Sequence, residues 1–162
     1  MEEIHKNTRM QTENEMEQQQ KDIQERLGNI RHKLLVMSGK GGVGKSSVAA
    51  YLAVILAKRG YRVGLMDVDL HGPSIPRLIG LREGIQPTAD PDKVKPVSAM
   101  PNLEVISIES LMGDAKDVAT IWRGPMKIGI IKQFISDIDW SPLDYLVIDS
   151  PPGTGDEPLT VA

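Results

Sequence analysis

Cysteine is absent from this chain of 162 residues. Without thiols the chain forms no disulfide and offers no thiolate ligand to a metal ion. Its apolar runs are far shorter than the roughly 20 residues that a transmembrane helix needs, and its polar N-terminus differs from a secretory signal peptide. The formal net charge of −3 lacks the basic excess typical of nucleic-acid-binding proteins. We therefore expect neither a membrane nor a nucleic acid as a partner.

Histidine is scarce as well. His5, His32 and His71 are scattered without the spacing of a metal site, so a histidine-based metal centre is not expected. No internal repeat is evident in the chain. The hydrophobic fraction of 40% suffices for the core of one soluble domain.

The most informative segment is a glycine-rich octapeptide from Gly39 to Ser46, which reads G-K-G-G-V-G-K-S. It fits the phosphate-binding pattern G-x-x-x-x-G-K-S/T. Glycines let consecutive backbone N–H groups turn toward a phosphate, Lys45 can reach the β- and γ-phosphates, and the Ser46 hydroxyl can ligate Mg²⁺. The alternative is a glycine-rich turn that binds nothing. The predicted nucleotide-binding residues are Gly39, Lys40, Gly41, Gly42, Val43, Gly44, Lys45, Ser46 and Ser47.

The flanks of this loop support the same interpretation. Residues 33–37 form a short apolar run that predicts a buried parallel strand. After the loop, apolar residues from Val48 to Leu56 recur at helical spacing, and Gly60 is placed as a helix C-cap. A strand, a glycine loop and a helix in this order place the positive end of the helix dipole at the phosphate site.

The rest of the chain continues an alternating strand and helix pattern. Further strands are predicted at 61–66, 103–108 and 145–149, with a short helix at 74–81. Residues 82–101, rich in proline and glycine, are interpreted as a long irregular excursion, either functional or mobile. Another helix is predicted to begin near Pro125, because proline is favourable in the first helical turn. Its apolar stripe consists of Ile128, Ile131, Ile135 and Ile138.

Residues 1–30 form a polar leader rich in Glu, Gln, Lys and Asn. Met16, Ile23, Leu27 and Ile30 recur at roughly helical spacing, which predicts a partly helical leader with a narrow apolar stripe. Two interpretations are open: a solvated leader that packs one edge onto the domain, or a helix that docks a partner. The nucleotide-binding domain is then expected to occupy residues 31–162.

Three aspartates follow predicted strands. Asp149 ends one apolar strand, and Asp67 and Asp69 end another. Because parallel strands place their carboxyl ends at one edge of the sheet, these side chains should converge there, beside the phosphate loop. Asp149 has the usual place of a carboxylate that holds Mg²⁺, and a carboxylate near the γ-phosphate can orient the attacking water. The alternative role of the Asp67 and Asp69 pair is a turn or a helix cap.

Lys40 narrows the class of phosphate-binding protein to which the chain can belong, because an ordinary phosphate loop does not require lysine at its second position. Residues 38–46 (S-G-K-G-G-V-G-K-S) resemble the deviant Walker A loop of the MinD/ParA/Mrp ATPases. Residues 67–76 (D-V-D-L-H-G-P-S-I-P), 122–126 (W-R-G-P-M) and 144–156 are similar to the Mrp/ApbC iron–sulfur carrier family within that class.

This resemblance implies a role for each matching residue. Lys40 would be the signature lysine, which reaches across a homodimer to the phosphates of the partner's site. Lys45 would be the Walker lysine, and Asp69 the switch I aspartate that positions water, so that Lys40, Lys45 and Asp69 would be catalytic. Ser46, Asp67 and Asp149 would lie at the Mg²⁺ site.

The resemblance also implies the fold and the function. The fold would be a three-layer α/β sandwich with a mostly parallel sheet, a P-loop NTPase of SIMIBI type that is incomplete on its C-terminal side. The function would be that of a cytoplasmic ATPase that assembles 4Fe–4S clusters or transfers them to client apoproteins, with ATP and Mg²⁺ as cofactors. The alternatives are a MinD/ParA-type ATP-gated spatial regulator and a truncated nucleotide-binding module without turnover.

One feature departs from the family pattern. Family members carry a C-x-x-C pair in their C-terminal part, where two subunits hold a bridging cluster, whereas this chain has no cysteine. The chain also ends before the strands that family members place after the segment 151–156. Truncation of a longer protein is the preferred interpretation, and a degenerate relative is the alternative.

Overall fold

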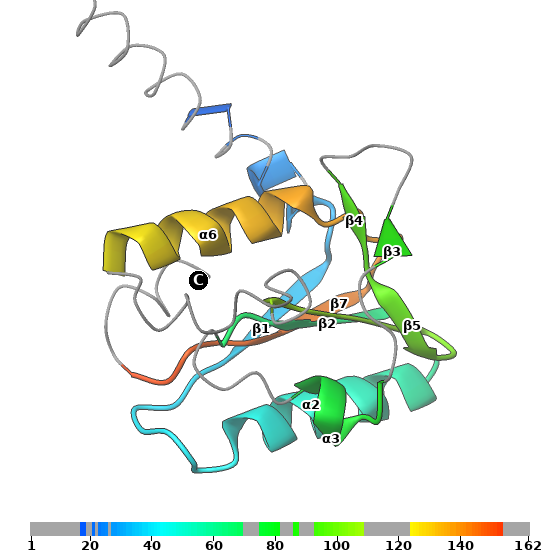
Figure 1. Cartoon of the computed structure of the whole chain (residues 1–162). Coiled ribbons are helices and arrows are strands. Elements are labelled where there is room, and N and C mark those ends of the chain that lie inside the picture. The colour runs from blue at the N-terminus through cyan, green and yellow to red at the C-terminus, as the bar shows by residue number, and fades with distance from the viewer. Residues whose placement is uncertain are drawn as a thin grey trace, which may run out of the picture.

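A computed structural model describes residues 17–18, 21, 23–25, 27–69, 75–81, 86–87, 93–108 and 124–153 of the chain. A five-stranded sheet with the order β1-β7-β2-β6-β5 is the centre of the molecule (Figure 1). Its strands are β1 (His32–Val36), β2 (Val63–Asp67), β5 (Val97–Met100), β6 (Leu103–Ser107) and β7 (Tyr145–Asp149). Four strands are parallel, and only β5 runs antiparallel to its neighbour β6. The predicted α/β fold with a mostly parallel sheet is confirmed.

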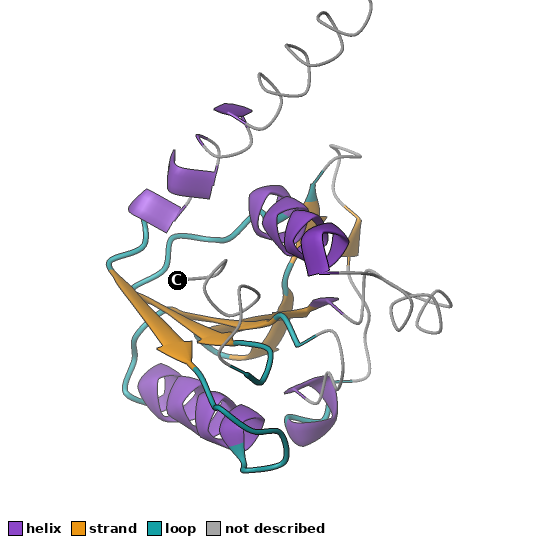
Figure 2. Cartoon of the chain, turned by 90° about the vertical axis from the view of Figure 1, so that its left-hand side faces the viewer, coloured by secondary structure: helices purple, strands orange, loops and turns teal. Residues whose placement is uncertain are grey.

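Helices cover both faces of the sheet. Helix α2 (Lys45–Lys58) and the single turn α3 (Ile75–Leu78) lie on one face, and α6 (Gly124–Asp137) lies on the other. Figure 2 shows α2 and α6 on opposite sides of the strands. The result is the three-layer arrangement that the family resemblance implied.

Helix α2 packs against the sheet through small side chains. Ala49, Ala53 and Ala57, spaced four residues apart, are at most 2% exposed and share a core with β2, β6 and β7. Residues four apart lie on one helix face, so the alanines bring the helix axis close to the strands. The helix ends as predicted: Gly60 has φ 89°, and its N–H donates to the Ala57 carbonyl at 2.9 Å.

The opposite core is built from larger side chains. Ile131, Phe134 and Ile135 of α6 are at most 4% exposed, and Ile138, just past the helix, is buried with them. The predicted apolar stripe is confirmed for the three isoleucines whose side chains the structure describes, and the side chain of Ile128 lies outside that set.

The described part of the leader also contacts this core. Residues 17–18, 21, 23–25 and 27–28 are helical, and Ile23, Leu27 and Ile30 pack on the α6 side. This contact favours a leader that packs onto the domain, while Met16 lies outside the described residues. The division of the chain after residue 30 stays a prediction.

The expectation of an irregular excursion over 82–101 was wrong for residues 86–87, 94–95 and 97–100. β3 (Gln86–Pro87) and β4 (Val94–Lys95) form a two-stranded antiparallel sheet, and β5 follows directly. Proline interrupts each strand after a few residues, which hid the pattern in the sequence. Such short strands with prolines are typical of sheet edges, because an edge strand does not need every N–H group for pairing.

The helices that the structure describes were compared with the requirements for crossing a membrane. None of the helices in the described ranges combines the length and the apolar character that crossing a bilayer requires.

Candidate phosphate-binding site

The register of the parallel strands brings the predicted acidic residues together. Asp149, the last residue of β7, lies opposite Val36 of β1 on one side and Asp67 of β2 on the other. Asp67 in turn lies opposite Ser107 of β6. The strands therefore end side by side, and the predicted convergence of Asp67 and Asp149 at one sheet edge is confirmed.

The glycine loop connects β1 to α2 at this edge. Gly42 and Gly44 have φ angles of 75° and 92°, in the left-handed region that favours glycine, and Gly44 caps the helix start. Val48 N–H donates to the Gly44 carbonyl at 3.0 Å, which begins the helical hydrogen bonding. The loop and the positive end of the α2 dipole thus face the same space, as an anion site requires.

That space is a cavity of about 440 Å³. Its lining residues are Ser38, Gly41, Gly42, Gly44, Lys45, Ser46, Ser47, Asp69, Leu78 and Pro152. Of the predicted nucleotide-binding residues, Gly39, Lys40 and Val43 do not line it, and all three are exposed to solvent.

Three lining residues are not among the predicted nucleotide-binding residues, although two of them, Ser38 and Pro152, fall in the family-like segments 38–46 and 144–156. Ser38, Leu78 and Pro152 reach the cavity from three separate segments. Ser38 stands directly before Gly39 and is the first residue of the segment 38–46 that resembles the family loop, so the sequence did carry a signal for it. The others come close only because α3 and the segment after β7 fold back to the loop.

Lys45 forms the electrostatic centre of the site. Its Nζ donates to Asp149 Oδ1 at 2.5 Å and lies 3.6 Å from Asp69 Oδ2. Lys45, Asp69 and Asp149 are 8%, 7% and 0% exposed. Buried charges are tolerated when they are paired, so each side chain depends on the others. A lysine held between two carboxylates can turn to the oxygens of a phosphate that enters the cavity.

Both carboxylate oxygens of Asp67 accept hydrogen bonds from the protein. Its Oδ1 accepts the Asp69 N–H at 3.1 Å, and its Oδ2 accepts the Ile75 N–H and the Ser107 hydroxyl, both at 3.3 Å. Burial raises the pKa of Asp67 to about 7, the two N–H groups oppose that rise, and the nearby negative charges of Asp149 and Asp69 add to it. These contacts match the turn-and-cap role that the sequence left open for this residue.

Asp149 retains an unused ligand atom. Its Oδ2 is buried and has no hydrogen-bond partner, although carboxylate oxygens inside proteins are normally paired. An oxygen of this kind, on a carboxylate that pairs with the first residue of α2, fits Mg²⁺ or one of its waters. No group of three or more His, Cys, Asp or Glu in the described ranges could hold a metal by itself. Phosphate oxygens and water would have to complete the coordination, as is usual for Mg²⁺.

The segment after β7 is fastened to the phosphate loop. Ser150 donates to the Val36 carbonyl from its N–H at 3.2 Å and from its hydroxyl at 3.0 Å. Gly153 N–H donates to the Ser38 carbonyl at 2.8 Å. Residues 150–153 are therefore linked by hydrogen bonds to the end of β1 and to Ser38, just before the loop.

The parallel sheet, the glycine loop before a helix and the buried lysine beside strand-end carboxylates define a P-loop NTPase. The family model of the ParA group, described as the NUBPL iron-transfer P-loop NTPases, matches residues 29–162. The chain belongs to this family.

Curated relatives agree with the assignment. The chain is 47% identical to the iron–sulfur cluster carrier protein of Methanocaldococcus jannaschii, over 96% of this chain and 53% of the relative. It is 49% identical to a cytosolic Fe–S cluster assembly factor of Saccharomyces cerevisiae, over 84% of this chain and 47% of the relative. The chain thus spans about half the length of the curated relatives it matches.

Solved structures place the fold in the same class. A nucleotide-binding protein from Archaeoglobus fulgidus, solved in complex with ADP, superposes with a TM-score of 0.71 at 44% identity, covering 87% of this chain and 53% of that one. The cell division ATPase MinD of Pyrococcus furiosus has a TM-score of 0.50 at 22% identity, covering 82% of this chain and 55% of that one. The likeness to MinD supports the fold alone.

Proposed function

We propose that this chain is the nucleotide-binding part of a cytoplasmic ATP-dependent iron–sulfur cluster carrier. One observation carries the proposal: Lys45, directly after the glycine loop, is buried between Asp149 and Asp69. A buried ammonium that two carboxylates hold beside an anion-binding loop is arranged for a nucleotide phosphate. The related protein that was solved with ADP supports the choice of nucleotide.

Within this proposal, the loop amides and Lys45 bind the phosphates, and Ser46 and Asp149 would hold Mg²⁺, directly or through water. When bound, the ion neutralises phosphate charge. Asp67, whose oxygens already have hydrogen-bond partners, would act from beside the metal by fixing Asp69 and the start of α3. Asp69 would orient the attacking water, since its carboxylate reaches the same cavity as Lys45.

ATP hydrolysis and dimerisation form the finer part of the proposal. Lys40 is exposed and lies outside the lining of its own cavity, which suits a lysine that reaches the site of a second copy. A second positive charge at the transferring phosphate would neutralise developing charge, as an arginine finger does. ATP binding and homodimer formation would then favour each other.

The cluster is the cargo. Iron–sulfur clusters are bound mainly by thiolates, and these 162 residues contain none. Thiolates for the cargo would therefore come from another polypeptide segment or from a client apoprotein. The names of the archaeal and yeast relatives support cluster carriage and, for the yeast protein, a cytosolic location.

Three measurements test the proposal on the full chain. Calorimetry should detect binding of Mg·ATP and Mg·ADP, and phosphate release should exceed that of Lys45→Ala. Sedimentation with an apo-ferredoxin should show association that depends on ATP and weakens with the holo-ferredoxin. Absence of nucleotide binding by folded protein would contradict the whole proposal. Binding without turnover, or without client association, would leave a nucleotide-binding module.

A further inference from the structure

Ser38 carries a buried hydroxyl with no hydrogen-bond partner. Its Oγ and the Oδ2 of Asp149 are the two buried side-chain polar atoms, in the part of the chain that the structure describes, that lack a partner. An unsatisfied buried polar atom costs stability, so each such atom in a folded protein needs an explanation. Ser38 lines the phosphate cavity, and Asp149 pairs with Lys45, which also lines it, so a ligand bound in this cavity is the explanation to test.

The position of Ser38 limits what that ligand can be. The residue lies between the end of β1 and Gly39, and it lines the cavity that Lys45 also lines. Its hydroxyl turns about a single side-chain bond among three staggered positions and can donate one hydrogen bond. The cavity is lined mainly by the glycine loop, whose amides at the start of α2 favour an anion, and Asp69 lines it as well; a phosphate that carries Mg²⁺ fits both features.

The backbone of Ser38 makes a separate contact. Its carbonyl accepts the Gly153 N–H at 2.8 Å, so the residue joins the phosphate loop to the segment after β7. The loop amides from Gly41 onward face the start of α2 and would surround the earlier phosphates. Ser38 lies on the side of residues 150–153, where a phosphate that extends past the loop would arrive.

We propose that the Ser38 hydroxyl donates a hydrogen bond to the terminal phosphate of a bound nucleoside triphosphate. Ser38 is thereby a positioning residue, because its side chain contacts the phosphate that distinguishes a triphosphate from a diphosphate. Its carbonyl, which accepts the Gly153 N–H, links this contact to the segment after β7. This inference rests on the proposed nucleotide-binding function and assigns to Ser38 the discrimination between the two nucleotides.

The test compares nucleotide affinities of wild type and Ser38→Ala by calorimetry, with a Mg²⁺-bound non-hydrolysable ATP analogue and with Mg·ADP. Loss of one hydrogen bond to a charged group should weaken binding of the ATP analogue about tenfold, with binding of ADP changed by less than about twofold. Hydrogen exchange at the Gly153 amide should slow when the analogue binds wild type, and it should not slow in Ser38→Ala. Ser38→Thr, which keeps the hydroxyl, should restore both effects.

Thermal unfolding without nucleotide separates this role from a structural one. Ser38→Ala removes an unsatisfied hydroxyl, so its Tm should equal or exceed that of wild type. Ser136→Ala is the matched control, because the buried Ser136 hydroxyl donates to the Gln133 carbonyl at 2.8 Å, away from the site. This control should lower Tm and leave both nucleotide affinities unchanged.

The outcomes that overturn the inference are distinct from those that overturn the proposed function. If wild type binds neither nucleotide, the proposed function fails. If wild type binds both, and Ser38→Ala retains the wild-type preference for the triphosphate or loses both affinities equally, the assignment of Ser38 fails while the nucleotide site stands.

Discussion

The charged side chains at the two ends of the central sheet differ in their burial. At the carboxyl end, Lys45, Asp69 and Asp149 are buried, and one oxygen of Asp149 has no partner. At the amino end, Arg62 and Asp144 form a salt bridge with an N–O distance of 3.2 Å, and both side chains contact solvent. The charges at both ends are paired, but those at the carboxyl end are buried and leave Asp149 Oδ2 without a partner, whereas the pair at the amino end contacts solvent.

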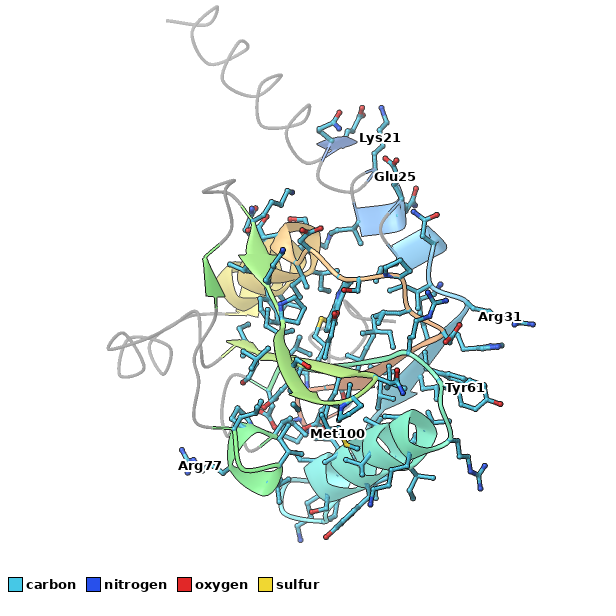
Figure 3. The ribbon with its side chains drawn as sticks, turned by 90° about the vertical axis from the view of Figure 1, so that its right-hand side faces the viewer. Lys21, Glu25, Arg31, Tyr61, Arg77 and Met100 are labelled. Atoms are coloured by element: carbon cyan, nitrogen blue, oxygen red, sulfur yellow. The ribbon has the colours of Figure 1, made fainter. Side chains whose placement is uncertain are left out.

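Aromatic side chains from three segments also pack against one another at the amino end. Tyr145 stacks on His32 with ring centroids 4.8 Å apart and meets Tyr61 edge-on at 5.1 Å. Figure 3 shows Tyr61 at the same end of the sheet as Arg31, the residue before β1. The amino end is thus held by contacts within the chain, whereas the carboxyl end contains buried polar atoms without partners, so changes at the two ends should have different readouts.

The largest effect on binding is expected from Lys45→Ala. It removes the cation of the carboxyl end, so Mg·ATP affinity should fall at least about a hundredfold by calorimetry. Because two buried carboxylates lose their partner, the free energy of unfolding should also fall, by about 3 kcal/mol in a urea titration. Lys40→Ala is the control, since this exposed lysine should spare affinity and reduce hydrolysis or dimerisation. Equal losses of affinity in both variants would contradict the division of roles.

The largest effect on stability from the amino end is expected from Gly64→Ala. A Cβ at this position would lie 2.6 Å from Leu143 Cδ1 and 2.9 Å from Trp140 Cζ3. Overpacking of this kind should lower the free energy of unfolding by about 1–3 kcal/mol, measured by urea titration. Gly129→Ala is the matched control: a Cβ there meets nothing within 4 Å, so this helical substitution should stabilise the protein. A stable Gly64→Ala would show that the amino end is loosely packed.

An intermediate effect is expected from Asp149→Asn. The substitution keeps the size of the side chain and removes the negative charge proposed to hold Mg²⁺. The enhancement of ATP affinity by Mg²⁺ should decrease about tenfold or more, measured by titration with and without the metal. Asp144→Asn, the same change at the amino end, should leave this enhancement unaltered. If both variants respond to Mg²⁺ as wild type does, Asp149 has no role at the metal.

The smallest effect is expected from Asp144→Asn itself. Hydrogen bonds from Arg62 lower the pKa of Asp144 in the folded protein. The pair therefore stabilises the fold above the ordinary aspartate pKa of about 4, and this contribution disappears as pH falls through the lowered folded value. The Tm difference between wild type and variant should be small at neutral pH, decrease with salt and vanish in acid. A difference that grows in acid would contradict this interpretation.

Local sequence pattern predicted most of the fold and of the phosphate loop. Apolar runs followed by Gly or Asp marked β1, β2 and β7, and Gly42, Gly44 and Gly60 adopt the positive φ angles that their positions required. The strands β3 to β5 were not predicted, because two- to four-residue strands broken by proline carry too few residues for a periodic signal.

The sequence by itself determined the chemistry available to this protein: a glycine loop with two lysines, aspartates at strand ends and no thiol. These features are local, since backbone freedom and side-chain type are properties of single residues and their neighbours. Only the tertiary structure decided which groups are partnered and which are left open. Lys45 and Asp149 are 104 positions apart and meet because β1 and β7 are neighbours, and the Ser38 hydroxyl is left without a hydrogen-bond partner by the packing around it. Pairing and desolvation depend on distance in space, which the order of residues along the chain does not contain.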